Sequence, residues 1–300
     1  MQSAVSSYRG RFAPSPTGPL HFGSLVAAIG SFADAKYNQG EWIIRIEDLD
    51  PPRTVPGSIT EILTALEKLG MEWDGEIIYQ SQRSAFYQEV LEQLIHEKMV
   101  YPCTCSRKEI ADSNMAEGGG IVYPGNCRNG ITHLNRTPAF RLKTDNFPVR
   151  FNDVLQGVVS QQLDREIGDF VLKRADAVYA YQLAVVVDDA EQQITHVVRG
   201  ADLLDSTPRQ IYLQRLLGYT TPVYMHLPIV NNAQGEKLSK QTNAAAIDVS
   251  NVVPQMVAAL GFLGQNPPND LVNTDLAGFW QWTINNWRID KIPLTGSFMR

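Results

Sequence analysis

The stretch that decides the fold reads RFAPSPTGPLHFGS and spans residues 11–24. Residues 10–13 are short and lean apolar, and the Pro, Ser, Thr and Gly run at 14–19 favours a loop, so a strand is predicted to end there. Residues 20 to about 38 carry apolar side chains at helical spacing, and residues 42–46 (WIIRI) have the β-branched content of a short buried strand. Strand, helix and strand in this order indicate a βαβ unit with a right-handed crossover. The sequence therefore predicts an α/β fold with a parallel sheet.

The rest of the chain divides into three parts. We expect a Rossmann-like core that is split between residues 1–100 and 180–245, because α/β patterning continues to the first boundary and resumes at the second. Residues 101–179 break that rhythm with cysteines, a glycine run and short strand-like pieces, and they predict an inserted α+β subdomain. Residues 246–300 predict a short helical region, with Trp280, Trp282 and Trp287 in its core. Outside the βαβ unit, helices are predicted at about 58–69, 84–99, 181–188, 207–217, 252–260 and 276–287, and strands at 139–143, 149–151, 170–173, 195–199 and 223–230.

Composition excludes several classes of protein. The 300 residues are 44% hydrophobic and 19% charged, with a formal net charge of −6, as expected of a globular chain of two or three domains. This acidic balance argues against a protein that grips nucleic acid through a general basic field, although residues 128–174 hold eight basic and five acidic side chains. No apolar run approaches the roughly 18 residues of a membrane helix, and residues 1–9 lack the apolar centre of a secretion signal. We expect a cytoplasmic protein without a membrane partner.

The three cysteines predict a metal site. Cys103 and Cys105 are separated by one residue, and Cys127 follows Tyr123 by four. An odd count of clustered cysteines is unlike a secreted disulfide framework, and zinc in structural sites prefers four tetrahedral ligands. Tyr123 could supply the fourth ligand beside the three thiolates, with His133 and Asp112 as rivals. The alternative is a group of small buried residues that holds no metal. A closed four-ligand shell would give one structural Zn²⁺.

Two distant segments carry residues suited to binding phosphate. His21 and Gly23 lie in the first turn of the predicted helix, where free amides and the helix dipole favour an anion. Lys237 and Lys240 lie three residues apart on a polar loop (KLSKQ) and could clamp phosphates. Each signal alone is weak, because a histidine near a helix start is more often a cap, and a short lysine run is more often ordinary surface.

Together the two segments resemble the HIGH and KMSKS signatures of class I aminoacyl-tRNA synthetases. The surrounding RFAPSPTG at 11–18 and RIEDLD at 45–50 narrow the resemblance to the glutamyl branch. The match covers about residues 9–241. It departs from the signatures at Ser24, which stands where HIGH ends in His, and at Gln241, which stands where KMSKS ends in Ser; both lysines are intact.

The resemblance implies ATP-dependent activation of L-glutamate. The α-carboxylate would attack the α-phosphorus of ATP to give glutamyl-adenylate and pyrophosphate, a step carried by positioning and charge stabilisation. His21, Gly23, Lys237 and Lys240 would serve ATP, with Mg²⁺ bridging its phosphates. The matched positions assign glutamate binding to Arg11, Phe12, Ala13, Pro14, Ser15, Glu47, Tyr181 and Arg199.

Within that set, residue chemistry suggests roles. Arg11 and Arg199 would pair bidentately with the two carboxylates, Glu47 would take the ammonium, and Tyr181 would donate a hydrogen bond. We expect Arg199 to hold the side-chain carboxylate, which would disfavour glutamine. Surface ion pairs are the commoner fate of such residues and remain the alternative.

The short segment after the lysine loop suggests the acceptor. Only 59 residues remain, too few for the anticodon-binding region of a full-length glutamyl-tRNA synthetase. This length, the cysteine pattern and PPR at 51–53 resemble the short paralogues of that enzyme, which implies tRNA-independent activation of glutamate and its transfer to the cyclopentenediol of queuosine at the wobble position of tRNA(Asp). The partners would be ATP, L-glutamate and queuosine-containing tRNA(Asp), bound by a monomer. The alternatives are a truncated synthetase that charges a tRNA 3′ end, a non-catalytic ATP- or tRNA-binding paralogue, and a nucleotidyltransferase of the same superfamily.

Overall fold

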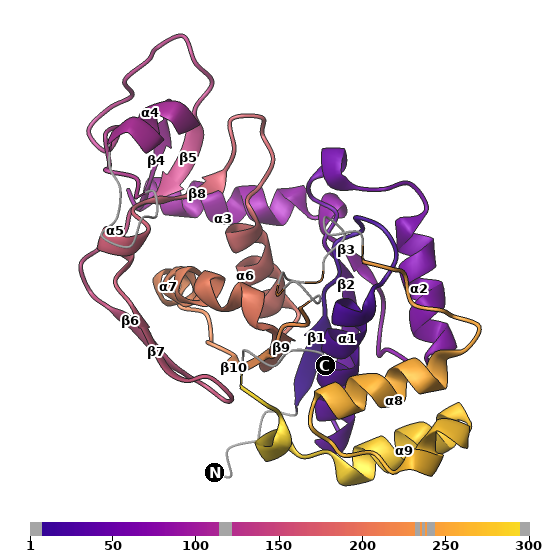
Figure 1. Cartoon of the computed structure of the whole chain (residues 1–300). Coiled ribbons are helices and arrows are strands. Elements are labelled where there is room, and N and C mark those ends of the chain that lie inside the picture. Colours follow the sequence, from indigo (N-terminus) through magenta and orange to yellow (C-terminus); the bar gives the residue numbers. More distant parts are fainter. Residues whose placement is uncertain (1–7, 114–121, 232–234, 236–237, 239–243, 295–300) are drawn as a thin grey trace, which may run out of the picture.

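A five-stranded parallel sheet in the order β10-β9-β1-β2-β3 forms the centre of the structure (Figure 1). The structure is a computed structural model that describes residues 8–113, 122–231, 235, 238 and 244–294. Its strands are β1 Arg9–Phe12, β2 Glu41–Ile46, β3 Ile78–Tyr79, β9 His196–Gly200 and β10 Val223–Leu227. Parallel sheets are covered on both faces, which is why β2 is buried at five successive residues. The pairing of β1 with β2 across one helix confirms the predicted βαβ unit.

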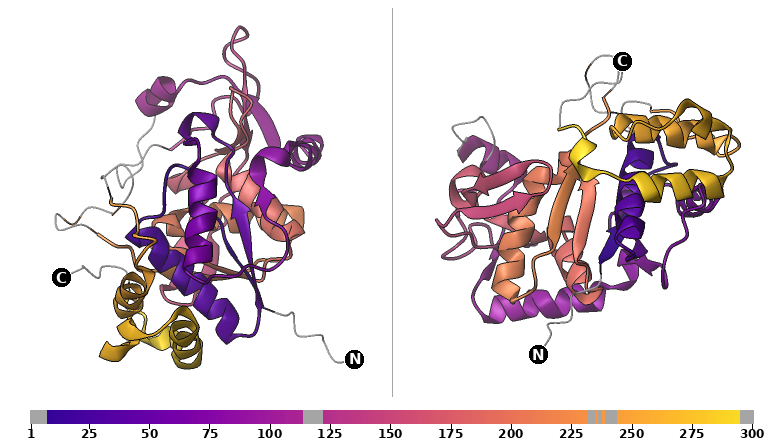
Figure 2. Two further views of the ribbon diagram at one scale, coloured as in Figure 1. Left: turned by 90° about the vertical axis from the view of Figure 1, so that its right-hand side faces the viewer. Right: turned by 90° about the horizontal axis from the view of Figure 1, so that it is seen from below.

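Helices cover both faces of the sheet (Figures 1 and 2). One apolar core contains Ile44 and Ile46 and is closed by α1 Phe22–Tyr37, α2 Ser58–Lys68, α8 Val252–Phe262 and α9 Leu276–Asn286. The other contains Ile43 and is closed by α3 Ser84–His96, α6 Tyr181–Glu191 and α7 Thr207–Leu217. Trp280 and Trp287 are buried in the first core, as predicted, whereas Trp282 is only partly buried against it.

The region after α3 forms two smaller sheets. A three-stranded sheet in the order β4-β5-β8 contains β4 Val100–Cys103, β5 Ala139–Leu142 and β8 Phe170–Lys173, with α4 Arg107–Ser113 and α5 Leu163–Glu166 nearby in the chain. The antiparallel hairpin of β6 Val149–Asp153 and β7 Gly157–Gln161 runs from this sheet to the edge strand β10 (Figure 1). There the amide of Val154 donates to the carbonyl of Tyr224 at 2.9 Å. The hairpin is therefore anchored on the large sheet.

Most element bounds match the predictions to within three residues. The helix predicted to residue 99 ends at His96, because Lys98 adopts a positive φ of 60°. The strand predicted to residue 230 ends at Leu227, because Pro228 has no amide hydrogen to donate to a neighbouring strand. Sequence patterning did not indicate β3, β4 and β7, nor the short 3₁₀ helices at Pro51–Arg53, Gln80–Gln82, Ala201–Ser206, Asn269–Asn273 and Ile289–Lys291.

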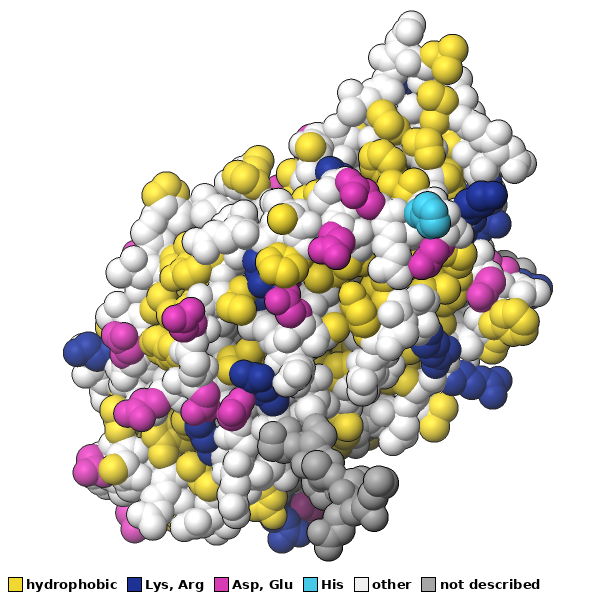
Figure 3. Space-filling model, turned by 180° about the vertical axis from the view of Figure 1, so that it is seen from behind, with side chains coloured by type: hydrophobic (Ala, Val, Ile, Leu, Met, Phe, Trp, Pro, Cys, Tyr) yellow, Lys and Arg dark blue, Asp and Glu magenta, His cyan; other side chains and the backbone are white. Residues whose placement is uncertain are grey.

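The surface agrees with the charge balance of the sequence. On the face seen in Figure 3, acidic and basic side chains are interspersed, without a broad field of one sign. Within the described residues, every helix is too short or too polar to cross a lipid bilayer.

Candidate active site

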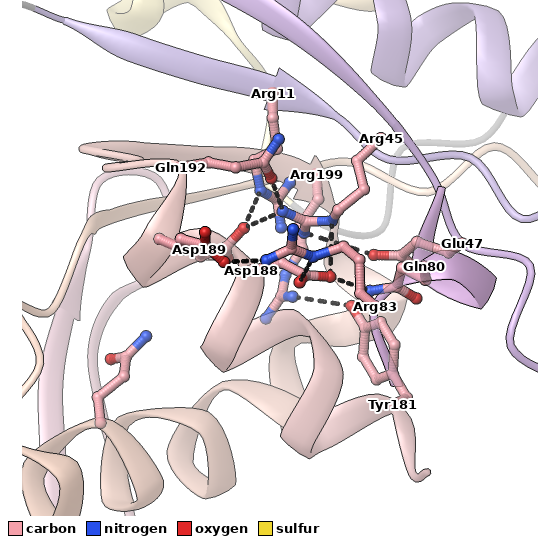
Figure 4. Close-up of polar contacts among 12 residues, drawn as sticks. Arg11, Arg45, Glu47, Gln80, Arg83, Tyr181, Asp188, Asp189, Gln192 and Arg199 are labelled. Atoms are coloured by element: carbon pink, nitrogen blue, oxygen red, sulfur yellow. Dashed lines mark hydrogen bonds and ion pairs between the residues drawn. The ribbon is translucent and has the colours of Figure 1, made fainter. Parts of the chain in front are cut away.

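Three arginines lie on one face of the sheet, near the carboxyl ends of adjacent strands (Figure 4). Arg11 of β1 is paired with Ile43 of β2, and Arg45 lies two residues further along β2 on the same face. Arg199 occupies the equivalent place on β9, the other neighbour of β1. The chain leaves β1 toward β2 on one side and reaches β9 on the other, so this edge is the topological switch point, where open α/β sheets bind ligands.

Two adjacent acids on α6 balance these cations. Asp189 Oδ1 accepts from Arg11 Nε at 3.2 Å and lies 2.8 Å from Arg45 Nη1. Burial opposes ionisation of Asp189, but the positive charges of Arg11 and Arg45 outweigh it and lower the pKa of this carboxyl. Asp188 is fully buried and accepts from Arg83 Nε at 2.6 Å; it also accepts 2.7 and 2.8 Å hydrogen bonds from Gln80 and Tyr87. The two acids fix α6 over the arginine face.

One carboxylate oxygen of Glu47, Oε1, is buried without a hydrogen-bond donor among the described residues. Glu47 follows β2 directly, its side chain is 9% exposed, and its Oε1 lies 3.5 Å from Arg45 Nη2. Burial raises the pKa of Glu47 to about 7, although Arg45 and Arg11 lower it. An acid in this state is suited to a cationic ligand group, because an ammonium would supply the missing donors.

Arg199 and Tyr181 form a pair of directed donors. Arg199 Nε donates to His226 Nε2 at 3.1 Å, and its Nη2 donates to Thr207 and Gln210, both at 2.8 Å. Its Nη1 donates to the Tyr181 hydroxyl at 3.1 Å, so the hydroxyl accepts there and its own proton points elsewhere. One N–H of Nη1 and the Tyr181 O–H remain for a ligand. This pair offers two donors to a carboxylate oxygen, whereas an amide nitrogen in the same place would face those donors.

The expected bidentate geometry therefore fits one arginine better than the other. Arg11 is 3% exposed and uses Nε for Asp189, and none of its Nη groups hydrogen-bonds to a described side chain or backbone group. Those two groups could clasp a carboxylate with both oxygens. Arg199 has a single N–H left, so a bidentate clasp by Arg199 alone does not fit its surroundings.

The residues that follow Arg11 do not all have side chains on the arginine face. Phe12 packs in the core on the opposite face and stacks on Trp42 with ring centroids 6.0 Å apart, so its side chain does not reach the arginine face. The carbonyl of Pro14 accepts from the amide of Glu47 at 3.0 Å and fixes the start of the acidic loop. Ala13 is half-buried and Ser15 is exposed.

A cavity of about 190 Å³ lies at the start of α1. His21 is the N-cap of α1, and its Nδ1 accepts from the amide of Ser24 at 3.3 Å. In the neutral ring the proton is then on Nε2, which can donate to a phosphate oxygen. A Cβ on Gly23 would lie 3.1 Å from Cε1 of the His21 ring, so a larger residue there would press on that ring. Leu238 lines the same cavity and connects it to the lysine loop; Lys237 and Lys240 lie outside the described residues.

The three thiols meet in one cluster. The Sγ atoms of Cys103, Cys105 and Cys127 all lie within 4.8 Å of one another, and the Tyr123 hydroxyl oxygen is 3.2 Å from Cys103 Sγ. Burial opposes ionisation of Cys127, yet hydrogen bonds from backbone and side-chain groups, the amide of Thr104 first, lower its thiol pKa to about 6. Tetrahedral zinc with bonds of about 2.3 Å needs sulfur atoms about 3.8 Å apart, so the four groups fit a metal.

Of the rival fourth ligands, His133 is directed elsewhere. Its Nε2 pairs with Glu109 Oε1 at 3.0 Å, and it is not among the clustered ligand atoms of the described residues. The side chain of Asp112 lies outside the described residues.

Sequence reasoning missed several members of the site. The motif at 45–50 assigns no role to Arg45, although an arginine inside WIIRI is itself a signal that a partner must be buried nearby. No local pattern indicates the roles of Asp188 and Asp189. Gln192, which accepts from Arg45 Nη1 at 2.7 Å, and His226 gave no local signal.

A parallel sheet in this order, with buried arginines and carboxylates at its switch point and a cavity at the start of the helix after β1, is the arrangement of a class I aminoacyl-tRNA synthetase catalytic domain. The family model described as tRNA synthetases class I (E and Q), catalytic domain, matches residues 7–259. A glutamate tRNA ligase from Elizabethkingia meningosepticum, solved with its amino acid, superposes with a TM-score of 0.80 and 26% identity, over 98% of this chain and 67% of that one. The glutamate-tRNA synthetase of Elizabethkingia anophelis gives a TM-score of 0.81 with 27% identity, over 98% of this chain and 68% of that one.

Relatives of similar length are considerably more similar. The Glutamyl-Q tRNA(Asp) synthetase of Dechloromonas aromatica is 54% identical over 290 residues, which is 96% of each chain. That of Chromobacterium violaceum is 53% identical over 286 residues, 95% of each chain. The chain therefore belongs to the glutamyl-Q tRNA(Asp) synthetases, within the class I family of glutamyl- and glutaminyl-tRNA synthetases.

Proposed function

We propose that this protein is an ATP-dependent ligase that activates L-glutamate without tRNA and transfers it to the cyclopentenediol of queuosine at the wobble position of tRNA(Asp). The observation that carries the proposal is the cluster of side chains at the switch point, where Arg11 and the Arg199–Tyr181 pair offer donors near Glu47, whose buried Oε1 has no hydrogen-bond partner among the described residues. Glutamate has two carboxylates and one ammonium, and this pocket offers complementary groups for each. The relatives that share half of the sequence are named for this activity.

In the activation step, an oxygen of the glutamate α-carboxylate forms a bond to the α-phosphorus of ATP. The bond from that phosphorus to the bridging oxygen breaks, and pyrophosphate leaves. Arg11 would hold the α-carboxylate, Glu47 the ammonium, and Arg199 with Tyr181 the side-chain carboxylate. The start of α1 and Nε2 of His21 would donate to the phosphates, together with Gly23, Lys237 and Lys240. Mg²⁺ bound to ATP would neutralise phosphate charge.

In the transfer step, a hydroxyl oxygen of the cyclopentenediol forms a bond to the carbonyl carbon of the adenylate. The bond from that carbon to the phosphate oxygen breaks, and AMP leaves as its phosphate takes up the hydroxyl proton. This diol is a cis-diol on a five-membered ring, like the terminal ribose to which larger synthetases attach amino acids. One pocket can thus serve either kind of acceptor, and the name of the relatives favours the anticodon base. The inserted subdomain at 101–179, with the basic excess of 128–174, is the part of the monomer that we expect to contact tRNA.

We also propose that Cys103, Cys105, Tyr123 and Cys127 hold one structural zinc ion. The short distances among these groups support a metal. Four protein ligands leave no position for a reacting water, so this ion would stabilise the inserted region rather than take part in the reaction.

Two assays test the function. The first is glutamate-dependent exchange of pyrophosphate into ATP without tRNA, for which a null result with folded protein would favour the non-catalytic binder. The second compares transfer of labelled glutamate to tRNA(Asp) with and without queuosine. An ester that survives removal of the CCA end, and that requires queuosine, is the expected result. An ester that is lost with the CCA end would identify a truncated synthetase that charges the 3′ end.

A further inference from the structure

Arg199 is held from behind by a histidine on the neighbouring strand. His226 of β10 is directly paired with Arg199 of β9, so both side chains lie on the same face of the sheet. His226 is fully buried, and its Nε2 accepts from Arg199 Nε at 3.1 Å. The Thr207 hydroxyl contacts both, at 3.1 Å from His226 Nε2 and 2.8 Å from Arg199 Nη2. His226 therefore sets the plane of the guanidinium only if its Nε2 carries a lone pair.

Asp153 fixes that state of the ring. Its Oδ2 lies 2.6 Å from His226 Nδ1, and its Oδ1 accepts from the amides of Leu155, Gln156 and His226 at 3.0, 2.9 and 3.2 Å. Burial opposes ionisation of Asp153, but its hydrogen bonds lower its pKa, so it stays a carboxylate that only accepts. The proton of the neutral ring must then be on Nδ1, and Nε2 faces Arg199 as an acceptor.

The position of the ring proton on His226 affects which donor of Arg199 is left for a ligand. Nε donates to His226, both N–H groups of Nη2 have acceptors in Thr207 and Gln210, and one N–H of Nη1 donates to Tyr181. If the His226 ring carried its proton on Nε2, that N–H would face the Nε–H of Arg199, and no hydrogen bond could form between them. Arg199 would then have to rotate, and its remaining donor would no longer lie beside the Tyr181 hydroxyl.

We propose that Asp153 and His226 are positioning residues that act through Arg199 to bind the side-chain carboxylate of glutamate and to disfavour glutamine. This inference rests on the proposed function. It also links the two parts of the chain, because Asp153 belongs to the β6–β7 hairpin of the inserted region, whereas His226 and Arg199 belong to the central sheet. The hairpin thus completes the glutamate pocket in the absence of tRNA.

The first test is Asp153→Asn, which preserves shape. Its amide nitrogen must face either His226 Nδ1, which forces the ring proton onto Nε2, or the three backbone amides, which then lack an acceptor. We expect the KM for glutamate in ATP–pyrophosphate exchange to rise about 10–100-fold, the scale of a lost hydrogen bond to a charged group, and the preference for glutamate over glutamine to fall. The KM for ATP and kcat should change little. Asp290→Asn, which removes the same charge from an exposed pair with Arg288, is the control.

A second pair of variants separates positioning from folding. In His226→Gln the side-chain amide oxygen can reach the place of Nε2 and accept from Arg199, whereas in His226→Asn the amide can reach only the place of Nδ1. We expect the Gln variant to keep a KM for glutamate closer to wild type and the Asn variant to show the full rise. Equal KM values in two folded variants would overturn the proposal.

Nitrogen NMR of ¹⁵N-histidine-labelled wild-type protein provides a readout that does not depend on activity. The resonance that disappears in His226→Gln identifies His226, and we expect it to show an unprotonated Nε2 and a protonated Nδ1. A proton on Nε2, or an unchanged KM for glutamate in Asp153→Asn, would overturn the proposal. A failure of the wild-type protein to activate glutamate would instead refute the proposed function and would leave the ring state measurable.

Discussion

Glu47→Gln is the sharpest test of the glutamate pocket. The substitution keeps the shape of the side chain and removes a charge that has no hydrogen-bond donor among the described residues. If the ammonium of glutamate supplies that donor, the loss is one charge-assisted hydrogen bond of about 1.5–3 kcal/mol, which raises the KM for glutamate about 10–150-fold. The KM for ATP should not change, because the cavity proposed for the nucleotide lies at the start of α1 and is not lined by Glu47.

The pH dependence gives the same variant a second signature. Burial raises the pKa of Glu47 to about 7, so below that pH the free enzyme carries a neutral carboxyl that cannot pair with an ammonium. For a single ionisation at that pKa, the KM of the wild-type protein should fall about tenfold from pH 6 to pH 8. Glu47→Gln should have a KM that is flat over this range. Glutamate titrations in ATP–pyrophosphate exchange at each pH measure both effects, and an equal slope in the two proteins would refute the assignment.

Stability provides the control for this prediction. The pKa of Glu47 is higher in the folded protein than its ordinary value of 4.5, so ionisation of Glu47 destabilises the fold progressively as the pH rises from about 4.5 through about 7. Glu47→Gln removes that effect and should be at least as stable as wild type at pH 8 in urea unfolding. A variant that loses both stability and affinity would mean that Glu47 supports the fold rather than the ligand.

Four further substitutions probe other parts of the site. Arg199→Ala should mainly raise the KM for glutamate in the exchange assay, and a collapse of kcat at unchanged KM would contradict its role. Asp188→Asn should cost about 3–5 kcal/mol of unfolding free energy in urea, because it uncouples a buried acid from Arg83 and Arg45; an effect below about 1 kcal/mol would argue against that network. Cys103→Ser should lower the zinc content measured by atomic absorption, and an unchanged stoichiometry would refute the ligand set. Lys240→Ala should slow adenylate formation about 10²–10³-fold in single-turnover assays, the scale of one preorganised donor, and an unchanged rate would exclude that role.

Local pattern was enough to predict most of the fold. The apolar periodicity of α1 and the β-branched run of β2 identify the βαβ unit, because parallel strands and amphipathic helices each leave a distinct period in the sequence. The observed ends of α3 and β10 differ from the predicted ends where a single residue determines the backbone conformation. Pro228 ends β10 and the positive φ of Lys98 ends α3, and neither effect changes hydrophobic periodicity.

The sequence motifs predicted which residues belong to the site, but not which partners those residues contact. Arg11 and Arg199 could be named from matched positions, and the structure brings them to one face of the sheet. How many donors each has left depends on partners far away in the chain: Asp189 is 178 residues from Arg11, and His226 is 27 residues from Arg199. Such contacts follow from strand register and helix packing. A single sequence read locally therefore could not show that both Nη groups of Arg11 lack a described partner, whereas most donors of Arg199 have one.

The neighbouring acids of α6 limit how this pocket can be redesigned. Asp189 faces Arg11, the proposed partner of the glutamate α-carboxylate, whereas Asp188, the next residue, joins α6 to α3 through Arg83 and Tyr87. A library randomised along this helix would return many unfolded proteins for each one with a new preference. Efforts to load a different amino acid would do better to vary the ring of contacts behind Arg199, where a change of preference need not break the joint between the two helices.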